Sequence, residues 1–362
     1  MRNAAFAVLL VPFSLHAQDS TPPPNRSRNP GHWHIGITYH DYGVTIGNAA
    51  RTNGIRLNFQ DADLERVNGV NVTIWKPNEP VTGTVNGLAI GVVGPGVDEL
   101  NGIGIGIGGV VAERRARWVT IGGLGAVSND RLEGIAIGGL GTVANGDLYG
   151  IAIGGLGTVA NRDLSGVAIA GLGAVANRDL TGLAIAGLGT VANNDLTGVA
   201  IAGLGTVANH NLTGIAIAGL GTVANRNLTG IAIGGLATVT NGDMRGISIG
   251  GLASVTNGSL HGLGIGGLGV VANRELRGVG LSGFRVDSDN VRGWATGLYV
   301  KTWELRGVSI GAYNRIRGSQ VGLTIGVYNS ARRLRGVQLG VINRARNNRG
   351  ILKVLPLVNA HF

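Results

Sequence analysis

Apolar and polar positions repeat every 16 residues through the middle of the chain. From Gly134 to Gly278 the unit follows G-(I/V/L)-A-I-(G/A)-G-L-(G/A)-T-V-A-N-x-D-L-x, and the leading glycines never slip in spacing. Large and small residues alternate at the start of each unit, which is the period of a β-strand. A Gly-Leu-Gly step, a second short apolar run and an Asn-containing turn follow. A strict period of this size indicates a repeat architecture.

Strands explain this unit better than helices, because each glycine costs about 1 kcal/mol in a helix interior. Neighbouring units are nearly identical and should therefore have the same surroundings, which parallel stacking by translation provides. We predict an all-β fold, a β-solenoid with 16-residue coils about 4.8 Å apart. The glycine spacing shortens to 14 or 15 residues after Gly278. Aromatic residues gather in the two less regular end regions, which we expect to cap the stack.

The alternation also divides the side chains of a unit into two sets. We expect the large columns to fill a narrow core, represented in one unit by Leu183, Ile185, Leu188, Val191 and Leu196. The small residues Gly182, Ala184 and Ala186 would then form a flat outer face. Self-association of two copies through this Ala/Gly face is a possible consequence.

The chain divides into five predicted segments. Residues 1–17 combine Arg2 with an apolar run that is too short to span a bilayer, as in a secretory signal peptide. Polar residues and prolines make residues 18–31 a flexible linker. The remaining segments are an N-terminal capping region (32–86), the solenoid repeats (87–277), and basic C-terminal repeats with a cap (278–362).

Positive charge is confined to the C-terminal segment. The whole chain carries 30 Lys/Arg and 20 Asp/Glu, and the residues from Gly278 onward carry 13 and 3, so the excess is ten in both cases. A basic surface of this kind attracts anionic partners, and we expect an anionic polysaccharide or lipopolysaccharide rather than nucleic acid in vivo. The alternative is a solvated cap that blocks end-to-end stacking. The candidate anion-binding residues are Arg306, Arg315, Arg317, Arg332, Arg333, Arg335, Arg344, Arg346 and Arg349.

Asparagine recurs at one position of every unit, and stacked amides can hydrogen-bond along a column. The predicted structural ladder consists of Asn145, Asn161, Asn177, Asn193, Asn209, Asn225, Asn241 and Asn257. Two residues later stands a column of Asp147, Asp163, Asp179, Asp195, Asn211, Asn227 and Asp243. A calcium ladder is the sharper interpretation of these carboxylates, but the repeats lack the GGxGxDxU form of calcium-binding solenoids. A metal cluster of His32, His34, His40 and Asp41 has no defined ligand spacing.

No catalytic constellation stands out from the repeats, and no cofactor motif accompanies the glycines. The glycine-rich runs are not followed by the lysine and helix of a phosphate-binding loop. We therefore expect no enzyme activity, no cofactor and no metal site.

Two segments resemble known sequences. Leu334-Arg-Gly-Val-Gln-Leu-Gly-Val-Ile-Asn343 resembles the GVQLGxxN units of a bacterial surface-repeat family, and Tyr39-His-Asp-Tyr-Gly-Val44 is similar to exported proteins with GLAIGGLG-type repeats. The resemblance implies export and a surface or envelope location, with no established activity.

The predicted function is that of an exported, non-enzymatic repeat protein of the cell envelope or surface, either a structural scaffold or a binding module for anionic surface molecules. One alternative is an outer-membrane β-barrel acting as a pore or anchor, for which a 16-residue unit is too short to hold two membrane strands. The second alternative is a polysaccharide-active β-helix enzyme, which needs acidic loops that these units lack.

Overall fold

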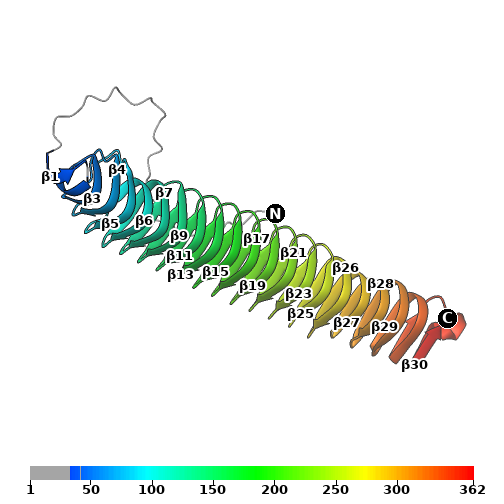
Figure 1. Cartoon of the computed structure of the whole chain (residues 1–362). Coiled ribbons are helices and arrows are strands. Elements are labelled where there is room, and N and C mark those ends of the chain that lie inside the picture. The colour runs from blue at the N-terminus through cyan, green and yellow to red at the C-terminus, as the bar shows by residue number, and fades with distance from the viewer. Residues whose placement is uncertain (1–32, 41) are drawn as a thin grey trace. The chain divides into compact units, whose positions relative to one another are not determined.

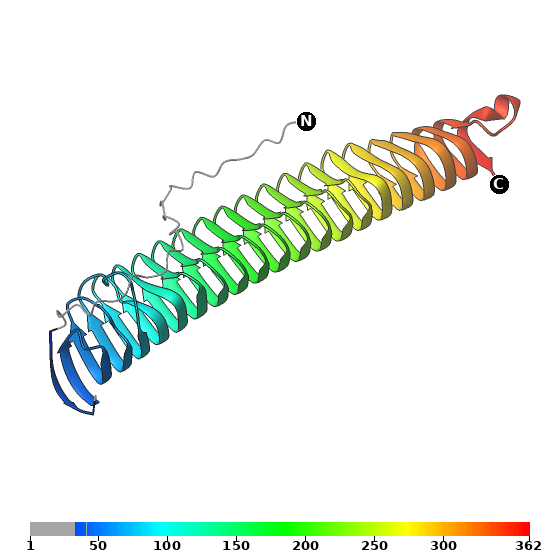
Figure 2. The same ribbon diagram turned by 90° about the horizontal axis from the view of Figure 1, so that it is seen from above.

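A computed structural model describes residues 33–40 and 42–362 of the chain. The predicted signal peptide and linker lie outside the described residues. Trp33–Phe362 forms one unit that is nearly all strand, a β-solenoid of about 17 coils (Figures 1 and 2). This confirms the predicted fold class. Within the described part of the chain, no helix is long and apolar enough to cross a membrane.

Each regular coil contains two strands. The first is six to eight residues long and belongs to the set β9 (Arg131–Gly138), β11 (Leu148–Gly154), β13 (Leu164–Ala170), β15 (Leu180–Ala186), β17 (Leu196–Ala202), β19 (Leu212–Ala218), β21 (Leu228–Gly234), β23 (Met244–Gly250) and β25 (Leu260–Gly266). The second is shorter and belongs to the set β8 (Gly125–Ser128), β10 (Gly141–Ala144), β12 (Gly157–Ala160), β14 (Gly173–Ala176), β16 (Gly189–Ala192), β18 (Gly205–Ala208), β20 (Gly221–Ala224), β22 (Ala237–Thr240) and β24 (Ala253–Thr256).

The coils stack in parallel with no slip in register. Each residue pairs with the residue 16 positions later, as Ala184 does with Ala200 between β15 and β17. The hydrogen bonding continues through the turns, because the Leu188 N–H donates to the Leu172 carbonyl at 2.8 Å. Identical units therefore have identical surroundings, as the sequence predicts.

The two ends of the stack depart from this pattern. The N-terminal strands are β1 (His34–Tyr39), β2 (Tyr42–Gly47), β3 (Arg51–Asn58), β4 (Arg66–Thr73), β5 (Thr84–Gly91), β6 (Gly96–Gly106) and β7 (Gly109–Gly122). The C-terminal elements are β26 (Gly269–Ser282), β27 (Arg285–Thr296), β28 (Tyr299–Ile310), β29 (Tyr313–Ala345), the 3₁₀ helix η1 (Gly350–Lys353) and β30 (Val354–His361). The parallel ladder begins at β2, and the outermost strands β1 and β30 pair antiparallel with β2 and β29.

The core is filled by the opposite set of side chains from the one expected. Ala184, Ala192 and Leu196 are fully buried, whereas Leu188 is 46% exposed. The expected core residues Leu183, Ile185 and Val191 are only half-buried. The predicted core is wrong for every large column except that of Leu196, and Ala184 and Ala186 form no outer face.

The physical reason is the narrow interior. A two-residue turn, Gly187-Leu188, joins the two strands of the coil. The buried Thr142 hydroxyl reaches across the interior to donate to the Ile153 carbonyl at 2.9 Å. Only methyl-sized side chains fit between strands this close, with room for one leucine per coil where the cross-section widens. The larger side chains must therefore point outward.

A column of glycines at the start of the first strand has the left-handed backbone conformation. Gly198 has φ of +124°, and a Cβ there would lie 2.1 Å from the Gly182 carbonyl oxygen in the coil below. Both the torsion angle and the close approach exclude other residues. The strict recurrence of this glycine in the sequence follows from these two constraints.

The first prediction compares two glycines of the same coil. We expect Gly198→Ala to lower the free energy of unfolding by about 1–3 kcal/mol from backbone strain alone. Gly205→Ala is the matched control, because its Cβ would meet only the Gly221 carbonyl oxygen at 3.7 Å. Chemical denaturation followed by circular dichroism measures both. Equal losses in the two variants would contradict the assigned role of the glycine column.

Candidate anion-binding edge

The turn from the second strand of one coil to the first strand of the next is the polar edge of the solenoid. In one coil it consists of Asn193, Asn194, Asp195 and the outward-facing Thr197. Every charged residue between Gly134 and Gly278 falls at this edge, at the equivalents of these positions. The polar edge is therefore where electrostatic recognition can occur in the regular coils.

The predicted asparagines form one continuous ladder along this edge. Each Asn Nδ2 donates to the Oδ1 of the asparagine in the coil below, over 2.8–3.1 Å, from Asn145 on Asn129 to Asn273 on Asn257. Each amide uses one donor and one acceptor in this ladder. The exposed ladder holds the turns in register and leaves part of each amide facing solvent.

The neighbouring Asp/Asn column has a role that the sequence analysis missed. The Oδ1 of each member accepts the backbone N–H of its equivalent in the next coil, as Asp179 does from Asp195 at 3.1 Å and Asn227 does from Asp243 at 2.9 Å. The position requires an acceptor oxygen and not a charge. The change from Asp to Asn at 211 and 227 was the sequence signal for this role.

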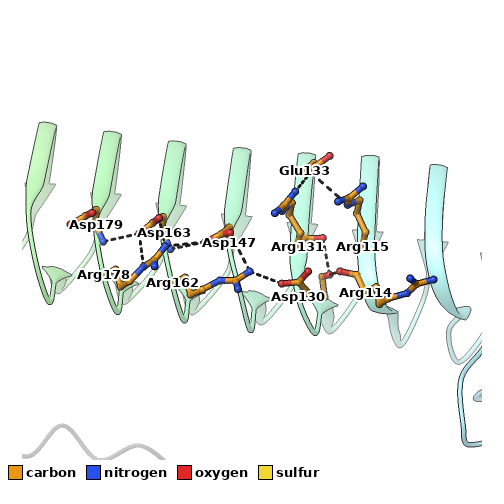
Figure 3. A network of polar contacts seen from close by, with 11 residues as sticks. Arg114, Arg115, Asp130, Arg131, Glu133, Asp147, Arg162, Asp163, Arg178 and Asp179 are labelled. Atoms are coloured by element: carbon orange, nitrogen blue, oxygen red, sulfur yellow. Dashed lines mark hydrogen bonds and ion pairs between the residues drawn. The ribbon is translucent and has the colours of Figure 1, made fainter.

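The arginines of the first regular coils are paired along the polar edge (Figure 3). Arg162 lies 2.5 Å from Asp130 and 3.2 Å from Asp147, and Arg178 lies 2.5 Å from Asp163. The hydrogen bond from Arg178 to Asp163 raises the pKa of this guanidinium. These cations are locally neutralised, and carboxylates occupy part of their binding capacity.

The nine predicted C-terminal arginines are all exposed, and none forms an ion pair with a described residue. The reason lies in the sequence, because residues 305–362 contain nine Arg, one Lys and no Asp or Glu. We call the exposed surface that carries these nine arginines the basic surface.

Ladder geometry places many of these arginines in columns. Buried Asn314, Asn329 and Asn343 are bonded to one another at 2.7 Å. Three residues after each of them stand Arg317, Arg332 and Arg346. Upstream register places the Arg317 column where the Asn ladder runs in earlier coils.

A second basic column precedes the glycine column. Arg277, Arg292 and Arg306 are direct partners in successive coils. Arg335 follows two coils later, because Gly336 stacks on Gly322 and Gly322 on Gly307. The two columns flank one turn, with cations about 4.8 Å apart along the stack. Cations at this spacing repel one another, and a bound anion would relieve the repulsion.

Tyrosines extend the basic surface on the outer face of the second strands. Tyr313 stacks on Tyr299 and Tyr328 with ring centroids 5.3 Å and 4.7 Å apart. Arg315 and Arg317 follow Tyr313 at alternate positions of β29 and are exposed like it. One face thus presents an aromatic column beside two cationic columns.

The other candidate sites have less support. The described residues contain no group of His, Asp and Glu that could hold a metal ion, and His32 and Asp41 of the suggested cluster lie outside the described residues. The acceptor oxygens of the Asp/Asn column are already engaged by backbone N–H groups. We compared the chain with family models, curated proteins and solved structures, and none of the three comparisons gives a match.

The second prediction tests the acceptor role of the Asp/Asn column. Asp195 Oδ1 accepts from the Asn211 backbone N–H at 2.9 Å and from its side-chain amide at 3.0 Å. We expect Asp195→Asn to change the free energy of unfolding by less than about 0.5 kcal/mol. Asp195→Leu should lower it by about 1–3 kcal/mol, because a donor loses its partner. Urea denaturation measures both, and a large loss in Asp195→Asn would show that charge is what matters.

Proposed function

We propose that this chain is an exported, non-enzymatic repeat protein of the cell envelope or surface, which binds an anionic polysaccharide through its basic C-terminal coils. The observation that carries the proposal is the set of nine exposed arginines without acidic partners. The paired arginines upstream show that this chain can neutralise its cations with carboxylates in adjacent coils. Its last coils supply no such carboxylates.

The periodicity of the basic surface supports an extended polymer as the ligand. Arginine columns about 4.8 Å apart offer a row of equivalent cations, which suits a chain molecule with regularly repeated negative charges. A single small anion would use only one or two of these positions. Exported acidic polysaccharides, including the charged sugars of lipopolysaccharide, have the required repetition.

The tyrosine column favours a sugar polymer among the anionic chains. Tyr299, Tyr313 and Tyr328 form a stacked row next to the cations. Aromatic rings can pack against the apolar faces of sugar rings while the arginines engage the acidic groups. The cationic guanidinium also presents a planar fork that matches a carboxylate or phosphate.

The scaffold role follows from the regular coils. Their in-register ladder holds the basic surface at one end of a long stack (Figure 2). We infer that the stack displays this surface at a distance from its N-terminal end. No step of chemistry is required of any residue in this function.

The third prediction concerns three aligned arginines. We expect Arg317→Gln, Arg332→Gln and Arg346→Gln together to weaken binding to an acidic polysaccharide by about 10–100-fold, because each exposed ion pair contributes roughly 0.5–1 kcal/mol. Polygalacturonate and heparin are the probes, measured by isothermal titration. Binding should also weaken as salt rises, since exposed charges are screened.

The matched control removes three arginines that have acidic partners. Arg162→Gln, Arg178→Gln and Arg274→Gln change the net charge by the same amount, but each arginine pairs with an aspartate in the structure. We expect this variant to bind like the parent protein. Equal weakening in both variants would show that only the overall charge matters. No binding by the parent protein would overturn the proposal.

A further inference from the structure

The edge opposite the polar edge carries an exposed column of leucines. These residues occupy the two-residue turn between the strands of each coil, and they are 46–60% exposed. The column consists of Leu124, Leu140, Leu156, Leu172, Leu188, Leu204, Leu220, Leu236, Leu252 and Leu268. We call this column and the half-buried Ile and Val columns beside it the leucine edge.

The leucine edge is free of charge along its length. The ten residues from the Ile135 position to the Ala144 position, and their equivalents up to Ala272, include no Asp, Glu, Lys, Arg, Trp or Tyr. The column continues through Phe284 and Leu298. Near the C-terminus this edge borders an apolar groove of about 750 Å³ that includes Val327 and Val341.

A surface of this size needs a cover. Ten leucines about 4.8 Å apart span roughly 43 Å, and with the flanking columns the leucine edge is roughly 15 Å wide. The product is on the order of 650 Å² per copy, close to the roughly 800 Å² that each partner buries in a standard stable interface. Soluble monomers rarely expose contiguous apolar patches larger than a few hundred Å².

Two other occupants fit the leucine edge poorly. Residues 18–31 are polar and rich in proline and asparagine, so their chemistry does not match an apolar column. Surfaces that lie on a membrane combine apolar side chains with flanking Lys, Arg or Trp. These residue types are missing from the leucine edge and its flanking columns, and the arginines of the last coils lie at the opposite edge.

We infer that the leucine edge is the interface with a second copy of this chain, packed antiparallel to the first. Only another stack of coils presents apolar side chains at the same spacing along the full length. Side chains of two such columns can interdigitate in a dry contact, as facing sheets do in steric zippers. An isologous twofold arrangement satisfies both copies with one surface.

Charge decides the orientation. The excess of ten positive charges lies after Gly278, and the preceding residues are balanced. Parallel copies would place two basic ends side by side, where they repel. Antiparallel copies place the basic ends at opposite poles of the dimer and leave both basic surfaces free.

The fourth prediction concerns the state of association in solution. We expect the purified full chain to be a dimer in sedimentation-velocity experiments at micromolar concentration. Leu188→Gln, Leu204→Gln and Leu220→Gln together should shift it to monomer, with the dissociation constant raised by at least a hundredfold. Thr181→Gln, Thr197→Gln and Thr213→Gln form the matched control on the polar edge, and this variant should remain dimeric.

A cross-linking experiment keeps the proposal testable if the leucine variant folds poorly. The chain has no cysteine, so single substitutions report one contact each. Full overlap of two antiparallel leucine columns pairs Leu140 with Leu252. A mixture of Leu140→Cys and Leu252→Cys should form a mixed disulfide on mild oxidation, whereas Leu140→Cys alone and the control Thr197→Cys should not.

Several outcomes would overturn the inference. A parent chain that stays monomeric, or a dimer that the leucine variant leaves intact, excludes the leucine edge as the interface. A disulfide between two Leu140→Cys chains shows a parallel arrangement. Sedimentation of the monomer with neutral phosphatidylcholine vesicles, lost in the leucine variant, shows that lipid covers this edge instead.

Discussion

In-register hydrogen bonding between successive coils is the constraint on which the whole structure depends. Strand β17 pairs with β15 and β19 residue by residue, and even the turn residues bond to their equivalents. A single coil buries only four or five small side chains and cannot offset the entropy of ordering 16 residues. Stability is therefore shared along the stack, and each position becomes a column with one chemical requirement.

These columns separate the surface into two edges of opposite character. The turn with Asn193 and Asp195 carries the polar ladders, and the turn with Leu188 carries an exposed apolar column. The separation arises because each turn recurs at the same place in every coil. The C-terminal coils keep the apolar edge and replace the Asn ladder by arginine, so a basic surface is added without any change in the backbone plan.

The sequence predicted the coil, its period and the stacking asparagines, because these depend only on repetition and on strand alternation. It could not assign Leu188 and Ala184 to the outside and the inside. An alternation of period two divides residues into two sets and does not say which set faces inward. The distance between the two strands decides this, and the short Gly187-Leu188 turn was the available signal for a narrow interior. The arginines were also predicted, but their lack of partners depends on which residues stack beside them.

The strict 16-residue register makes the number of coils a gauge of length. Removing a whole unit, such as 198–213, leaves every column continuous and brings the basic surface about 4.8 Å nearer to the N-terminal strands. Removing one residue within a unit breaks the Asn ladder, the glycine column and the core columns at once. Duplication and loss of entire units are therefore the changes that this architecture accommodates, and they set its reach in steps of one coil.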